Sequence, residues 1–124
     1  MGPHENYSDM NHASMIDRYF RSADDEYVNY IMPQEHGNHT KTKYLNIKNG
    51  LSFYESEFMV FNVSHYTASM LMSARHQDDL KKDNATNIRI DYKSSGMGSN
   101  SCGPGLMEKY QLNEKEICFE FYMK

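Results

Sequence analysis

Two groups of residues in this sequence are of types that could bind a metal ion. Glu35, His36 and His39 lie close together in the chain. A zinc site normally needs three or four ligands in a fixed geometry, and nothing nearby completes this set. The acidic run 22–26 would also attract a cation, but a cation site needs more ligands in a set geometry, so a solvated turn is the simpler interpretation. We therefore predict no metal site.

Catalysis by a cysteine or by paired carboxylates is the next possibility. Cys102 is a candidate nucleophile, but a reactive thiol needs a base or a positive field beside it, and the sequence shows neither. A packed or polar loop cysteine is the simpler interpretation. The 17 Asp and Glu residues are enough for a glycosidase pair, yet no spacing singles out two that would face each other across a cleft. We assign no catalytic residue.

The stretch 94–105 is the most distinctive feature of the chain. It contains four glycines, one proline and four serines. Gly and Pro at this density exclude a regular helix or a central strand. Strand-like runs precede it at 87–92 and follow it at 116–122. We therefore expect a shaped, exposed loop on a sheet edge, where binding groups commonly lie. A plain connection between two strands is the alternative.

Length, charge and composition narrow the class of protein. The 124 residues are enough for one domain. The net charge of −4 argues against nucleic-acid and anionic-membrane partners, because both favour a basic face. No apolar run approaches the roughly 20 residues of a membrane span. Two cysteines are too few for a disulfide scaffold, and the chain opens with no signal segment, so we expect a cytoplasmic protein.

Alternating and apolar runs predict a β-hairpin in the middle of the chain. Residues 40–47 alternate between apolar and polar types, and Asn49-Gly50 is a strong turn signal. Residues 51–54 would return beside the first strand, and residues 58–63 would follow as a largely buried strand.

Short helices and one further strand are expected around this hairpin. Residues 12–20 carry a helical apolar stripe, and Ser64 or Thr67 would begin a second helix ending at Met72. Residues 27–32 look extended. The charged run 74–82 is either a further helical turn or an exposed arm. The sum is mostly antiparallel β with one or two short helices.

Read together, five stretches resemble the C-terminal, small-chain domain of the glycoside hydrolase family 2 β-galactosidases. The first, Gly2 to Asp9, follows the family's Gly-Pro-x-Glu-Asn-Tyr-Pro-Asp pattern, with Ser8 in place of proline. The second follows Tyr-x-x-Pro-Gln-Glu-Asn-Gly, with His36 in place of asparagine. The order and spacing hold over nearly the whole chain. The five stretches are 2–9, 30–37, 61–67, the surroundings of His76, and 91–98.

The resemblance implies an antiparallel β supersandwich of the galactose-mutarotase type. Residues 1–124 would form a single domain, corresponding to the later part of the small-chain domain. The catalytic glutamates would lie in an α/β barrel outside this chain, so the chain alone is expected to be inactive. The magnesium and sodium of the family are likewise bound elsewhere, and we expect no cofactor in this chain.

The resemblance also implies partners. Half a sandwich leaves sheet edges and an apolar face uncovered, and such surfaces tend to pair with another chain. We therefore expect the rest of a β-galactosidase chain, or a large subunit, as the partner. The chain alone is expected to self-associate, and the complete enzyme would bind a galactoside.

One role in substrate contact follows from the resemblance. In the family, the glycine-rich loop reaches toward the mouth of the active site, and in several members a tryptophan of this loop stacks on the sugar beyond the cleaved galactose. Cys102 corresponds to that position, and cysteine cannot stack. The expected substrate-contact residues are Gly96, Met97, Gly98, Ser99, Asn100, Ser101 and Cys102.

Three functions remain open from the sequence. The first is a non-catalytic portion of a β-galactosidase that completes the active-site mouth for hydrolysis of terminal β-galactosides such as lactose. The second is a stand-alone carbohydrate-binding module using exposed tyrosines and the loop; direct sugar binding by the isolated chain would distinguish it. The third is an enzyme of mutarotase type, with His65 or His76 beside Glu35 or Asp91, which rests on fold analogy alone.

Overall fold

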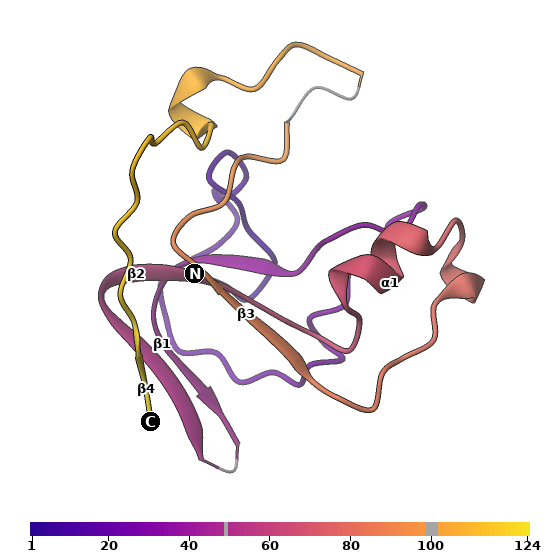
Figure 1. The fold of residues 1–124 in the computed structure, drawn as a ribbon, viewed down its shortest axis with the longest axis horizontal. Helices are drawn as coiled ribbons and strands as arrows, with labels where there is room; N and C mark the ends of the chain where they lie inside the picture. Colours follow the sequence, from indigo (N-terminus) through magenta and orange to yellow (C-terminus); the bar gives the residue numbers. More distant parts are fainter. Residues whose placement is uncertain (49, 99–101) are drawn as a thin grey trace.

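The protein is described by a computed structural model over residues 1–48, 50–98 and 102–124 (Figure 1). Its centre is an antiparallel sheet in which strand β2 pairs with every other strand of the sheet. β1 lies along one edge of β2, and β3 and β4 pair with separate parts of β2 on its other edge. The strands are β1 (Asn38–Ile47), β2 (Leu51–Ser64), β3 (Asn87–Asp91) and β4 (Tyr122–Met123).

This architecture confirms the mainly β, antiparallel fold predicted from the sequence, and it is consistent with a partial β sandwich. The predicted hairpin is present, although Asn49 of its turn lies outside the described residues. The two expected returning strands are one continuous strand, β2. Residues 55–58 stand opposite the single residue Lys43, between the pairs Thr42–Met59 and Tyr44–Tyr54. A bulge therefore absorbs the polar segment without interrupting the strand.

The predicted second helix is confirmed as α1 (Ala68–Ser73). Thr67 caps it, because its Oγ1 accepts a hydrogen bond from the N–H of Met70 at 3.2 Å. Leu71 is the residue that α1 buries. The charged run that follows contains only a single 3₁₀ turn, η1 (Gln77–Asp79), and a second such turn, η2 (Glu108–Tyr110), lies beyond the glycine-rich stretch.

The helix predicted over residues 12–20 is wrong. Met15 instead pairs with Gly2, donating to and accepting from its backbone at 2.9 and 3.0 Å, so these groups are not available for helical hydrogen bonds. The apolar stripe that suggested the helix is largely outside the core: Ile16 is 66 % and Phe20 is 94 % exposed. Helical spacing without a surface to pack against does not by itself form a helix.

Two predicted strands also need correction. Residues 27–32 are irregular and not a strand, and Ile31 within them is almost fully exposed. The final strand, predicted over 116–122, is limited to β4 (Tyr122–Met123), which pairs with Phe53 and Tyr54 of β2. Among the described residues, neither 27–32 nor 116–121 has a paired strand to complete its backbone hydrogen bonds.

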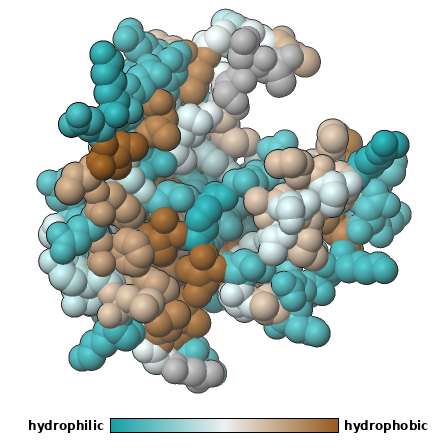
Figure 2. All heavy atoms as spheres, in the orientation of Figure 1, coloured by the Kyte–Doolittle hydropathy of each residue, from teal (hydrophilic) through white to brown (hydrophobic). Residues whose placement is uncertain are grey.

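The core is small and centred on β2. Met59 is completely buried, and Phe53, Val60 and Val63 are nearly so. Many other large apolar side chains are exposed, and Figure 2 shows hydrophobic side chains at the surface near β2 and β4. This exposed apolar surface is what the sequence predicted for part of a sandwich. Within the described residues, no helix has the length and apolar character needed to span a membrane.

Candidate functional site

The glycine-rich loop is held at its base by a carboxylate from the other end of the sequence. Asp9 Oδ1 accepts a hydrogen bond from the N–H of Met97 at 2.8 Å, and Oδ2 accepts one from the N–H of Gly98 at 3.0 Å. Asp9 itself is placed by a tight turn in which the backbones of Tyr7 and Met10 exchange two hydrogen bonds of 3.0 Å. The carboxylate thus fixes where the loop leaves the body of the domain.

Gly96 is needed for this arrangement. A Cβ at position 96 would lie 2.6 Å from Cγ of Asp9 and 2.7 Å from its Oδ2, which is closer than any side chain tolerates. Burial works to raise the pKa of Asp9, but the N–H donors of Gly98 and Met97 outweigh it and hold the pKa below its ordinary value. The carboxylate is therefore charged when it holds the loop.

The expected substrate-contact residues fall into three groups. Gly96, Met97 and Gly98 are brought together around Asp9. Cys102 is a free and exposed thiol. Ser99, Asn100 and Ser101 lie outside the described residues. The base of the loop is also tied to β1, because the amide of Asn38, only 1 % exposed, donates to Ser94 Oγ at 3.1 Å.

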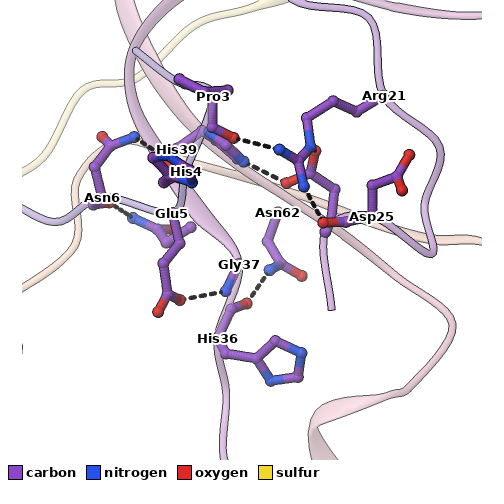
Figure 3. A network of polar contacts seen from close by, with 12 residues as sticks. Pro3, His4, Glu5, Asn6, Arg21, Asp25, His36, Gly37, His39 and Asn62 are labelled. Atoms are coloured by element: carbon purple, nitrogen blue, oxygen red, sulfur yellow. Dashed lines mark hydrogen bonds and ion pairs between the residues drawn. The ribbon is translucent and has the colours of Figure 1, made fainter. Parts of the chain in front are cut away.

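A second polar network surrounds Glu5, close to the N-terminus (Figure 3). Its carboxylate accepts hydrogen bonds from the hydroxyl of Tyr30 at 2.5 Å, the hydroxyl of Tyr7 at 3.3 Å and the N–H of Gly37 at 2.8 Å. Burial, followed by the contacts with Glu5, raises the pKa of Tyr30 to about 12, so this phenol remains a donor. Sequence reasoning missed this network, although Glu5 and Gly37 both stand in the family patterns.

Next to it lies a buried ion cluster. Glu26 pairs with Arg21 Nε at 2.8 Å and with His39 Nε2 at 2.5 Å, and both Glu26 and His39 are buried. The ring of His39 stacks on Phe61, with 4.8 Å between centroids. Glu5 and Glu26 line the same open cavity of about 410 Å³. Both carboxylates already have partners, so this cavity does not present a free acid and base pair.

The residues considered for metal binding have other partners. Glu35 pairs with Arg89, His36 Nδ1 contacts the carbonyl of Gln34 at 2.7 Å, and His39 pairs with Glu26. Across residues 1–48, 50–98 and 102–124, no group of three or more His, Cys, Asp or Glu side chains is arranged to hold a metal ion. The acidic run includes an Asp25 carboxylate that accepts from the N–H and hydroxyl of Ser22.

The mutarotase-type constellation is not assembled either. Glu35 and Asp91 do meet, but through the guanidinium of Arg89 between them. His65 Nδ1 instead contacts the carbonyl of Ala85 at 3.0 Å. His76 is the N-cap of η1. Among the described residues, neither histidine has a hydrogen bond or ion pair with either carboxylate.

Known proteins match the chain over nearly its entire length. The sequence profile of the β-galactosidase small chain matches residues 1–123. The chain belongs to the β-galactosidase small chain family. It is similar to the β-galactosidases of Staphylococcus xylosus (36 % identity over 99 % of this chain), Actinobacillus pleuropneumoniae (38 % over 97 %) and Kluyveromyces lactis (35 % over 97 %). It spans only 12–13 % of the length of these relatives.

The five stretches that carry the β-galactosidase resemblance contact one another in the structure. Glu5, from the first, binds Tyr30 and Gly37 of the second. Figure 3 shows Asn62, from the third, pointing toward the carbonyl of His36 in the second, to which its amide donates.

The remaining two stretches are hydrogen-bonded to the same group of residues. Gln77, beside His76, donates to the carbonyl of Tyr30. Asp9 carries the contacts on to the glycine-rich loop. The small-chain patterns therefore mark one continuous polar framework, which connects the body of the domain to the loop.

Proposed function

We propose that this chain is a non-catalytic portion of a β-galactosidase that completes the mouth of the active site for hydrolysis of terminal β-galactosides such as lactose. The loop 94–105 would contribute this contact, with Gly96, Met97, Gly98, Ser99, Asn100, Ser101 and Cys102 facing substrate. The match to the small chain over residues 1–123 is the observation that carries the proposal. The catalytic glutamates, and the magnesium and sodium of the family, would lie outside these residues, in a cytoplasmic enzyme.

The anchoring of the loop supports this role. A loop that shapes a substrate site must be held rigidly, because small displacements of a contact cost much of its effect. Asp9 supplies two hydrogen bonds at the base of the loop, and Asn38 supplies a third through Ser94. The exposed Cys102 lacks an aromatic face. We therefore propose that this loop selects weakly for the group attached to galactose.

The exposed apolar surface supports a partner. Phe20 and Ile31 are 94 % and 99 % exposed, and Met72 is 83 % exposed. Side chains of this kind are usually covered in a stable assembly. We propose that the rest of a β-galactosidase covers them and that the isolated chain self-associates. Analytical ultracentrifugation at high concentration should show dimers or larger species, and a clean monomer would count against self-association.

A chimera tests the function. The matching segment of the Staphylococcus xylosus β-galactosidase is replaced by residues 1–124, and hydrolysis of a chromogenic galactoside is compared with that of the same enzyme truncated before the segment. The chimera should be active and the truncated enzyme inactive. Gly96→Ala in the chimera should lower kcat/KM, whereas Gly103→Ala, where an added Cβ would meet no atom of the described residues within 4 Å, should not.

Sugar binding by the isolated chain distinguishes a completing portion of a β-galactosidase from a stand-alone carbohydrate-binding module. A completing portion should bind galactose and lactose weakly or not at all, since most of the sugar site lies elsewhere. An inactive chimera, together with tight galactoside binding by the well-folded isolated chain, would favour a carbohydrate-binding module instead.

A further inference from the structure

A second open cavity, separate from the Glu5 network, lies behind the glycine-rich loop. Its volume is about 350 Å³, within the range of small-ligand sites. Its walls come from the N-terminal turn, from β1 and β2, from the segment after β3, and from η2. Ser94, the first residue of the loop, is part of the lining. Five separate parts of the chain thus converge on one hollow.

The charge of this cavity is opposite to that of the chain. Of the residues that the structure describes, Lys41, Lys93 and Lys109 line it and no acidic residue does, whereas the net charge of the whole chain is −4. Lys93 is neutralised by Glu114 at 2.6 Å. Among the described residues, Lys41 and Lys109 form no ion pair. Asp9 follows the lining residue Ser8 in the sequence, but its carboxylate accepts hydrogen bonds from the N–H groups of Met97 and Gly98.

One further feature indicates a functional position in this cavity. Lys41 has a φ of 51°, a left-handed conformation that is costly for a residue with a side chain. Such strain concentrates at functional positions.

Aromatic side chains supply a further part of the lining. Tyr92, Tyr110 and Phe58 contribute flat apolar faces, and Lys109 Nζ lies 4.6 Å from the ring centroid of Tyr110. A pyranose ring has an apolar face that stacks on such side chains. The lysine charges would not pair with a neutral sugar, whereas they would pair with a phosphate group.

We propose that this cavity binds a phosphorylated monosaccharide. The phosphate lies between Lys41 and Lys109, and the sugar ring lies against Tyr92 or Tyr110. The site consists wholly of residues of this chain, so the proposal does not depend on the chain's part in galactoside hydrolysis. Because Ser94 joins the cavity to the loop, a bound ligand would touch the base of the loop.

Calorimetric titration of the 124-residue chain tests the proposal, with galactose 6-phosphate and galactose as matched probes. Galactose 6-phosphate should bind at least about tenfold more tightly than galactose, since charge-assisted hydrogen bonds depend on the phosphate. Binding should weaken as salt is added. The sequence contains no Trp, so the emission of its ten tyrosines, which include Tyr92 and Tyr110, gives a second readout.

Three variants locate the site. Lys41→Gly removes a charge and suits the left-handed backbone, so it should fold at least as well as the parent. Lys41→Gly and Lys109→Gln should each weaken binding of galactose 6-phosphate by about tenfold. Lys48→Gln, at the end of the β1–β2 hairpin away from the cavity, should leave binding unchanged.

Several results would overturn the proposal. These are equal binding of galactose and its phosphate, absence of binding by both at about millimolar concentration, and unchanged affinity in the folded Lys41→Gly and Lys109→Gln variants. If inorganic phosphate bound as tightly as galactose 6-phosphate, the sugar would contribute nothing and the assigned ligand would be wrong.

Discussion

Replacing Gly96 by alanine should release the glycine-rich loop from the body of the domain. The added Cβ would lie 2.6 Å from Cγ of Asp9, so the carboxylate must turn away. It would then lose its hydrogen bonds to the N–H groups of Met97 and Gly98, now 2.8 and 3.0 Å long. The strands of the sheet are not touched by this change.

The expected cost follows from those two bonds. A hydrogen bond to a charged group contributes about 1.5–3 kcal/mol. Asp9 is only partly buried, so we take the lower end for each bond. Alanine also lowers the conformational entropy of the unfolded chain, which offsets the loss by about 0.4–1 kcal/mol. The free energy of unfolding should therefore fall by roughly 2 kcal/mol.

Urea unfolding followed by circular dichroism measures this change. Gly103→Ala is the matched control, because a Cβ there would meet no atom within 4 Å in the part of the chain that the structure describes, and it should be neutral or slightly stabilising. In an Asp9→Ala background, Gly96→Ala should cost almost nothing, because the group it displaces is already gone. Equal losses in both backgrounds, or a loss at Gly103 as large as at Gly96, would refute the reasoning.

Three further predictions concern other parts of the structure. Because the folded pKa of Asp9 is lowered, its stabilising contribution is present above its ordinary pKa and lost as pH falls through the folded value; subtracting the acid unfolding curve of Asp9→Asn from that of the parent should isolate this loss. Gly37→Ala should destabilise more than Gly50→Ala in thermal unfolding, because both have positive φ but only position 37 lacks room for a Cβ. Met59→Ala should lower the unfolding free energy by about 2–5 kcal/mol, and the exposed Met72→Ala by less than about 0.5 kcal/mol in the same denaturant titration.

Local patterns predicted the central sheet because β1, β2 and β3 are neighbours that complete one another's backbone hydrogen bonds. Alternation at 40–47 and the apolar run at 58–63 face neighbouring strands, so their propensities and their packing agree. The stripe at 12–20 has a helical period, but its Ile16 and Phe20 are largely exposed among the described residues, and the backbone of Met15 pairs with Gly2 instead. Periodicity alone cannot show whether a partner surface exists.

The candidate site was only partly predictable. Composition identified the loop 94–105, and the family patterns marked Glu5, Asp9 and Gly37 as members of conspicuous stretches. The contacts themselves join residues far apart in the chain, such as Asp9 and Gly98, and no local pattern encodes such a pairing. The lysine-lined cavity was missed for the same reason, because its walls come from segments that only the folded chain brings together.

The tie between Asp9 and the loop also has a consequence for synthesis. Met97 follows Asp9 by 88 positions. At about 5–20 residues per second, the ribosome makes the donor N–H groups roughly 4–18 s after the carboxylate. Until then the N-terminal turn has no loop to hold, and β1 and β2 can already have paired. The base of the loop is therefore fixed only after β1, β2 and β3 have been made, and η2 and β4 follow it in the chain.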